Sequence, residues 1–167
     1  MIEPPKKYFR LFPGNEVRLM NAYFVTCTGC VKDEDGSIKE IHCTYDPASR
    51  GGNSPDGRKV KGTIHWVAAE TAISAEARLY ENLIDEDTAN EKGAIYDEGG
   101  ELYLNPASLT VKQCFLEPAF AGAAAYDRFQ FVRQGFFCVD PKDSTAARLV
   151  FNRTVSLKSS FVLPKES

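Results

Sequence analysis

The stretch VRLMNAYFV, residues 17–25, indicates the fold of this chain. Its apolar side chains recur at odd positions, namely Val17, Leu19, Tyr23 and Val25. Side chains two residues apart lie on the same face of a β-strand. The dipeptide Asp35-Gly36 follows, and Asp-Gly between two alternating segments is a strong hairpin signal. This part of the chain therefore predicts antiparallel strands joined by a tight turn.

The same alternation continues through most of the chain. Extended segments are expected at 37–45, 62–67, 109–116, 128–131, 135–139 and 150–157. Residues 46–57 contain two prolines and three glycines, a composition that predicts a loop. Residues 74–84 differ, because Leu79 with Leu83 and Tyr80 with Ile84 are i, i+4 pairs that favour a helix. Short strands at this spacing predict an all-β barrel or sandwich.

Length and composition are those of a globular protein. The 167 residues are 43% hydrophobic, enough for one or two small domains with a real core. A membrane-spanning helix needs roughly 20 apolar residues, and the apolar runs here are only a handful of residues long. No signal peptide opens the chain, because MIEPP at residues 1–5 has the wrong composition. We therefore expect a cytoplasmic protein with no membrane partner.

Charge is distributed unevenly. The formal net charge of −3 argues against a general nucleic-acid binder, and no DNA partner is expected. Residues 85–101 hold seven acidic side chains and one lysine, which predicts a solvated loop. Basic residues cluster elsewhere: Lys6, Lys7, Arg10 and Arg18, then Arg50, Arg58, Lys59 and Lys61. The distribution permits one basic face, while a protein-interaction barrel that uses the acidic loop is a competing hypothesis.

The five cysteines and the two histidines limit the possible chemistry. An odd number of cysteines without a secretion signal predicts reduced thiols. Cys27 and Cys30 have the spacing of half a zinc site or of a redox pair, and His42 or Cys43 could complete a metal site. Thiols on a strand and its turn are the simpler interpretation. The chain contains no nucleophile elbow, phosphate loop, HExxH or dinucleotide motif, so no catalytic residue, metal or cofactor is assigned to it.

Several longer segments, in order, resemble one family. They are EVRLMNAY (16–23), CTYD (43–46), DGRKVKGTIHWV (56–67), RLY (78–80), FQF with Arg133 and Gly135 (129–135), and VFNRTV (150–155). Together they resemble the anticodon-binding region of the glutaminyl-tRNA synthetases. The resemblance implies two β-barrels, and it favours a strand over residues 74–84. A glutamyl-tRNA synthetase of related architecture is the close alternative.

The resemblance also implies which functions belong to this chain and which belong to the rest of the parent polypeptide. Residues 8–100 correspond to a distal-type barrel, and 101–167 with the segment 1–7 to an incomplete proximal-type barrel. The HIGH and KMSKS signatures of the catalytic core do not occur here, so the chain alone is expected not to be an enzyme. ATP, Mg²⁺ and glutamine chemistry would belong to a catalytic core in the same parent polypeptide, and the partner of this chain would be tRNA.

Four side chains are implied as the RNA-binding residues. Arg10 matches an arginine that reads the third anticodon base, and Arg18 matches one near the first base. Gln130 and Arg133 match the pair that reads the middle uracil. A rigid guanidinium fork suits this task because it can meet guanine O6 and N7 with two hydrogen bonds. Met20 stands where the family can have a second arginine.

The spacing of Gln130 and Arg133 places a condition on that assignment. Residues three apart on a straight strand face opposite sides of the sheet, so the two could not share a ligand there. Gly135 and the flanking apolar runs predict a hairpin tip between the two side chains. Proteins read RNA sequence mainly in single-stranded loops, where unpaired bases expose their edges. A hairpin tip is therefore expected to carry this part of the site.

Overall fold

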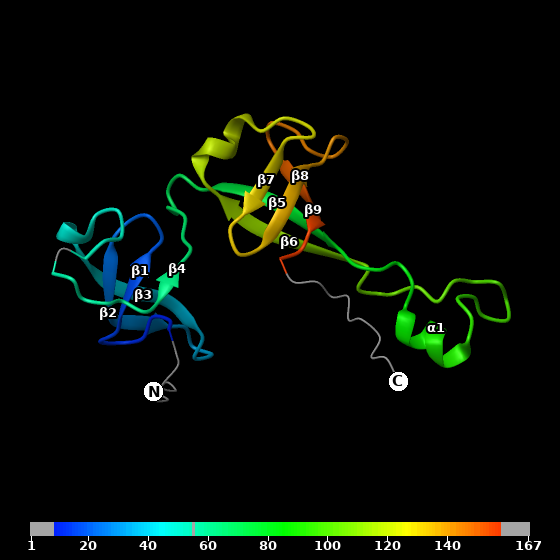
Figure 1. The fold of residues 1–167 in the computed structure, drawn as a ribbon, viewed down its shortest axis with the longest axis horizontal. Coiled ribbons are helices and arrows are strands. Elements are labelled where there is room, and N and C mark those ends of the chain that lie inside the picture. Colours follow the sequence, from blue (N-terminus) through cyan, green and yellow to red (C-terminus); the bar gives the residue numbers. More distant parts are fainter. Residues whose placement is uncertain (1–8, 55, 158–167) are drawn as a thin grey trace. The chain divides into compact units, whose positions relative to one another are not determined.

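The computed structural model describes residues 9–54 and 56–157 (Figure 1). The chain divides into two compact units, Met1–Trp66 and Val67–Ser167. Strands dominate both units, so the all-β prediction is confirmed. The described strands form one four-stranded and one five-stranded sheet, and closure of either into a barrel stays a prediction.

The first unit is built on one hairpin and two shorter strands. Its elements are β1 (Glu16–Leu19), β2 (Phe24–Lys32), β3 (Ile38–Asp46), a 3-10 turn (Pro47–Ser49) and β4 (Thr63–Ile64). The strand order is β3-β2-β1-β4, antiparallel except for the parallel pair of β1 and β4. Gly36 takes a φ of 83° in the predicted turn between β2 and β3, a backbone conformation that glycine adopts readily. Val17 and Phe24 are completely buried in this unit.

Within residues 67–157 the second unit contains five strands and one α-helix. Its elements are β5 (Ile73–Tyr80), α1 (Glu86–Lys92), β6 (Leu109–Leu116), a 3-10 turn (Pro118–Gly122), β7 (Arg128–Phe131), β8 (Gly135–Val139) and β9 (Leu149–Val155). The order is β6-β5-β9-β8-β7, with β5 and β9 parallel. Phe137, Leu149 and Phe151 form the centre of the core. The rings of Phe120 and Phe131 pack on Phe151 at centroid distances of 6.0 and 5.2 Å.

Residues 73–80 form a strand, as the family resemblance implied and against the i, i+4 pairs. β5 is hydrogen-bonded to β6 on one side and to β9 on the other. Its Ala75 and Ala77 lie in the core. Because an i, i+4 pair contributes only about 0.2–0.5 kcal/mol, pairing on both edges of the strand and burial outweigh it.

The acidic stretch is not wholly a loop. Residues 86–92 form α1, and the Asp85 side chain caps this helix by accepting from the Thr88 amide at 3.2 Å. Gly93 ends the helix with a φ of 67°, as glycine commonly does. No residue of α1 is buried, and Figure 1 shows it beyond the ends of β5 and β6. The expected loop is therefore corrected to a capped and solvated helix within a loop.

The boundary between the units differs from the expected one near residue 100. β5 belongs to the second sheet because its partners are β6 and β9, and the division falls at Trp66 and Val67. The segments 1–7 and 158–167, which were assigned to the proximal-type barrel, lie outside the described residues, as do Lys6 and Lys7. Naming the units distal-type and proximal-type stays a prediction. Within the described residues, no helix has the length and apolar composition to span a membrane.

Candidate nucleic-acid interface

Arg10 lies on an exposed segment just before β1. Two contacts hold the backbone of this segment. The Asn15 side-chain amide donates to the Arg10 carbonyl oxygen at 2.8 Å. The Phe9 carbonyl oxygen approaches Gly62 so closely that a Cβ there would lie 2.6 Å from it. The Arg10 side chain is exposed, and the backbone that carries it is held at Phe9 and at Arg10.

Arg18 lies on β1 and is half-buried. Its guanidinium carbon is 5.1 Å from the centroid of the buried Phe24 ring, a favourable position for a cation over an aromatic face. Gly52 leaves room for its aliphatic part, because a Cβ on Gly52 would lie 3.1 Å from Cδ of Arg18. The buried Nε has no hydrogen-bond partner among the described residues. The guanidinium group is thus positioned by packing and retains an unused donor.

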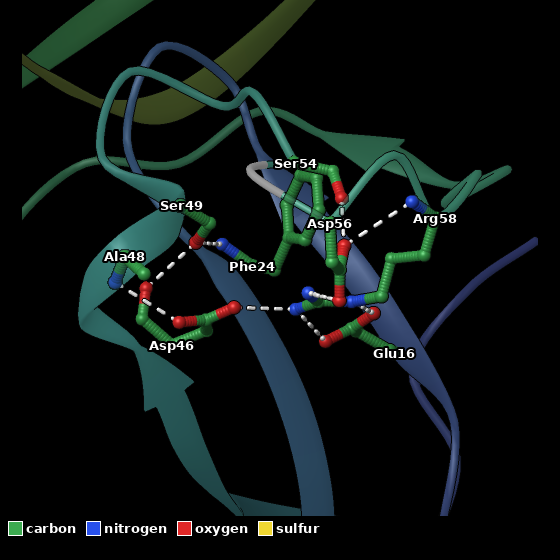
Figure 2. A network of polar contacts seen from close by, with 8 residues as sticks. All are labelled: Glu16, Phe24, Asp46, Ala48, Ser49, Ser54, Asp56 and Arg58. Carbon is green, nitrogen blue, oxygen red and sulfur yellow. Dashed lines mark hydrogen bonds and ion pairs between the residues drawn. The ribbon is translucent and has the colours of Figure 1, made fainter.

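Arg58 is the centre of a network of ion pairs, which Figure 2 shows. Its guanidinium group makes two bonds of 3.0 Å to the Glu16 carboxylate. It also contacts Asp46 at 2.5 Å and Asp56 at 2.8 Å, and it lies 5.0 Å from the Phe24 ring centroid. One side chain therefore ties the loop of residues 50–62 to both β1 and the end of β3.

This network affects the titration of its members. The pKa of Asp56 falls to about 2 from an ordinary 3.8, first because the Ser54 hydroxyl donates to it and then through its bonds to Arg58. The Arg58 side chain lowers the pKa of Asp46, and the carboxylates of Glu16, Asp46 and Asp56 raise the pKa of Arg58. Arg58 consequently serves the fold, whereas its neighbours Lys59 and Lys61 are exposed.

Gln130 and Arg133 lie on the predicted hairpin, so the expected tip is confirmed. β7 and β8 pair from Arg128 opposite Cys138 to Phe131 opposite Gly135, and the Gln134 amide donates to the Phe131 carbonyl at 2.8 Å. Gln130 is exposed on β7, and Arg133 is exposed in the turn with a φ of 64°.

Gly135 explains why the turn takes this form. Its φ is 141°, and a Cβ at this position would lie 2.5 Å from the Val155 carbonyl oxygen. Only glycine avoids both the backbone strain and this close contact. The residue therefore sets the turn that presents Arg133 to solvent.

A cleft of about 820 Å³ opens beside Arg133. Its lining comes from the ends of β5 and β9 and from the turn: Tyr80, Glu81, Asn82, Arg133, Gln134, Arg153, Thr154, Val155, Ser156 and Leu157. Arg153 is paired with Glu81 at 2.6 Å, and the Tyr80 hydroxyl donates to Asn152 at 3.1 Å. Gln130 is not among the residues that line this cleft. The structure thus groups Arg133 with an aromatic ring, an amide and a second arginine.

Sequence reasoning assigned no role to Tyr80, Asn82 or Arg153. RLY at 78–80 and VFNRTV at 150–155 contributed to the resemblance, but only as matching segments. The signal that could have linked them is the parallel pairing of β5 with β9, which places Arg78 opposite Asn152. That pairing joins residues more than 70 positions apart, and no local pattern predicts it.

The cysteines do not form the arrangement that the CxxC spacing suggested. All five thiols are free, Cys27 buried and Cys43 exposed. Cys27 stands opposite Cys43 across β2 and β3, whereas Cys30 stands opposite Ile41. No group of three or more His, Cys, Asp or Glu side chains able to hold a metal ion occurs within residues 9–54 and 56–157.

The chain matches known proteins along most of its length. Two family models, both described as tRNA synthetases class I (E and Q), anti-codon binding domain, match residues 2–46 and 63–140. The glutamine–tRNA ligase of Clostridium kluyveri is 54% identical over 167 residues, covering 99% of this chain and 29% of that protein. The glutamine–tRNA ligase of Pseudomonas putida is 48% identical over 165 residues, covering 96% of this chain and 28% of that protein.

The glutamine–tRNA ligase of Clostridium perfringens is 55% identical over 163 residues, covering 98% of this chain and 29% of that protein. The chain thus spans less than a third of the length of these relatives. The two family matches follow one another in order and together account for most of its residues. On this evidence the chain belongs to the anticodon-binding domain family of the class I tRNA synthetases (E and Q).

Proposed function

We propose that this chain binds tRNA and reads its anticodon loop, as the C-terminal part of a glutamine–tRNA ligase. The names of the relatives support glutamine rather than glutamate as the amino acid. Catalysis of ATP-dependent glutaminylation, with ATP and Mg²⁺, is assigned to the remainder of that longer protein. The proposed location is the cytoplasm, where the tRNA partner is used in translation.

The observation that carries this proposal is the hairpin tip of β7 and β8. It carries Gln130 on β7 and Arg133 in the turn that follows, both exposed. A glutamine amide can donate to and accept from the edge of a base, and a guanidinium group donates only. Together they suit a pyrimidine with two carbonyl oxygens and one N–H, as uracil has. The Tyr80 ring and Arg153 beside Arg133 offer a surface on which an unstacked base can lie.

Arg10 and Arg18 supply the corresponding groups in the first unit. Arg10 is exposed on an anchored backbone and is assigned to the third anticodon base. Arg18 is assigned to the first base, because packing on Phe24 holds its guanidinium group and its Nε donor is unused.

Binding of anticodon stem-loops tests these assignments. The wild-type chain and its variants are titrated with a stem-loop carrying the glutamine anticodon and with single-base substitutions, at fixed salt. Arg10→Ala should lose discrimination at the third base by about 1–3 kcal/mol, the worth of a bidentate contact. Gln130→Ala and Arg133→Ala should instead relax the preference for the middle uracil.

Two charge-matched controls separate base reading from general electrostatics. Lys39→Ala removes an exposed cation from β3 in the first unit, and Lys112→Ala removes one from β6 in the second. Each should leave base preference intact, with at most a uniform loss and a smaller salt slope. If Arg10→Ala behaves like Lys39→Ala, Arg10 contacts phosphate only and its assignment is wrong.

A further inference from the structure

Two thiols face each other in the middle of the first unit. Cys27 on β2 and Cys43 on β3 are direct partners in the antiparallel register. Cys27 is 2% exposed, and Cys43 is exposed. One thiol is therefore inside the sheet packing while the one opposite it is open to solvent.

Backbone hydrogen bonds identify the kind of pair that they form. The Cys27 amide donates to the Asn15 carbonyl at 3.0 Å, and the Cys27 carbonyl accepts from the Gly14 amide at 2.8 Å. Both backbone groups of Cys27 thus point away from β3. Cys27 and Cys43 consequently occupy a non-hydrogen-bonded site of the ladder, where opposed Cα atoms are about 4.5 Å apart and side chains are closest.

That geometry lies within the range for a covalent link. Disulfides join residues with Cα atoms about 4.4–6.8 Å apart and Cβ atoms about 3.5–4.5 Å apart. Burial first, and then the neighbouring Cys27 thiol, raise the pKa of Cys43, as expected where two thiols adjoin. The two sulfur atoms can therefore approach without any change in strand register.

Two register shifts lie on β2 between the turn and Cys27, one between Val31 and Lys32 and one between Cys27 and Gly29, and Cys27 is opposite Cys43 beyond both. Register shifts between Cys27 and Gly29, so that Thr28 is an extra residue on β2. The Thr28 hydroxyl donates to the His42 carbonyl at 3.1 Å. After the bulge Cys30 stands opposite Ile41. The spacing of Cys27 and Cys30 suggests a pair along one strand, but the sheet pairs Cys27 with Cys43 across two strands.

We propose that Cys27 and Cys43 form a reversible oxidation site, which closes as a cross-strand disulfide when a hydroperoxide is the oxidant. The Cys43 thiolate attacks the peroxide oxygen, the O–O bond breaks, and hydroxide leaves, giving a sulfenic acid on Cys43. The Cys27 sulfur then attacks the Cys43 sulfur, and the S–O bond breaks with release of water. With hydrogen peroxide, two thiols lose two electrons and two protons, and one peroxide becomes two waters.

The order of these steps follows from exposure. Cys43 reaches solvent and meets the oxidant first, whereas Cys27 is shielded and serves as the resolving thiol. A sulfenic acid with a thiol directly opposite is expected to condense before further oxidation. The oxidation site does not depend on RNA binding, so failure of either proposal would leave the other unaffected.

Peptide mapping of the full 167-residue chain tests the proposal. The reduced chain is treated with hydrogen peroxide, remaining thiols are alkylated, and the protein is digested with trypsin without reduction. The expected product links residues 19–32 to residues 40–50, leaves three of the five thiols alkylated, and disappears with dithiothreitol.

Two variants assign the link, because trypsin leaves Cys27 and Cys30 on one peptide. Cys30→Ser is the matched control and should retain the link to residues 40–50, whereas Cys43→Ser should abolish it. Cys43 is exposed, so the serine variant is expected to fold. The proposal is overturned by a link that Cys30→Ser removes, by links only between chains, or by Cys43 oxidised to a sulfinic acid without any link.

Discussion

Gly62→Ala tests how the fold anchors the segment that carries Arg10. A Cβ at residue 62 would lie 2.6 Å from the Phe9 carbonyl oxygen and 3.0 Å from Cγ1 of Val17. Val17 is completely buried, and the Gly62 carbonyl accepts from the Arg18 amide at 2.7 Å. Neither β1 nor Gly62 can move away without losing that bond, so the Phe9 carbonyl has to shift.

Overpacking of this kind typically costs about 1–3 kcal/mol. With a urea m-value of about 1–1.5 kcal/mol/M for a small unit, the midpoint of unfolding should fall by about 0.7–3 M. The displaced Phe9 carbonyl also moves the neighbouring Arg10. Gly62→Ala should therefore weaken discrimination at the third anticodon base in the stem-loop assay, in addition to lowering stability.

Tryptophan fluorescence measures this unit selectively, because Trp66 is the only tryptophan in the chain. Its indole N–H donates to the Met20 carbonyl at 3.0 Å, within the first unit. Gly29→Ala is the matched control, since nothing lies within 4 Å of a Cβ on that strand residue. The control should be neutral or stabilising by about 0.4–1 kcal/mol. If both variants unfold at the same urea concentration, the close approach to Phe9 does not anchor this segment.

Three further perturbations have defined outcomes. Gly135→Ala should destabilise the second unit by about 2–5 kcal/mol, because the new Cβ adds backbone strain and contacts Val155. Amide hydrogen exchange in β8 and β9 should become faster, and unchanged exchange would refute this. Phe151→Ala should cost about 3–5 kcal/mol in urea unfolding followed by circular dichroism, because its ring is fully buried. The pKa of Asp56 is held at about 2, below 3.8, so its contribution to stability is present above pH 4 and is lost as the pH falls toward 2. Asp56→Asn should remove that part of the acid sensitivity of Trp66 fluorescence, and an unchanged acid profile would contradict it.

Local sequence patterns were enough for the strands with clear alternation. Asp35-Gly36 produced the hairpin of β2 and β3, and Gly135 marked the tip between Gln130 and Arg133. The signals for α1 were also present, as Asp85 at the N-cap and Gly93 at the C-cap. The density of acidic residues, rather than any lack of capping signals, led to the expectation of a loop there.

The role of Arg58 could not be deduced from its neighbours in the sequence. Because Lys59 and Lys61 follow it, the sequence suggests that Arg58 is one cation of a basic stretch. Its carboxylate partners come from β1, from the end of β3 and from its own loop: Glu16, Asp46 and Asp56. Three carboxylates around one guanidinium group make it a structural anchor, and only folding brings Glu16, 42 positions earlier in the sequence, to it.

By itself the sequence determined the all-β class and the hairpin that carries Gln130 and Arg133, because these depend on period-two patterning and on turn chemistry between near neighbours. The family followed from the resemblance of several segments in order along the chain. Only the tertiary structure decided that Cys27 faces Cys43 rather than Cys30, and that Tyr80 and Arg153 join Arg133 around one cleft. The cleft depends on the parallel pairing of β5 with β9, which are distant in sequence. The pairing of Cys27 with Cys43 depends on two register shifts within the hairpin of β2 and β3. Such pairing is decided by burial and hydrogen bonding over a whole sheet, which no local window contains.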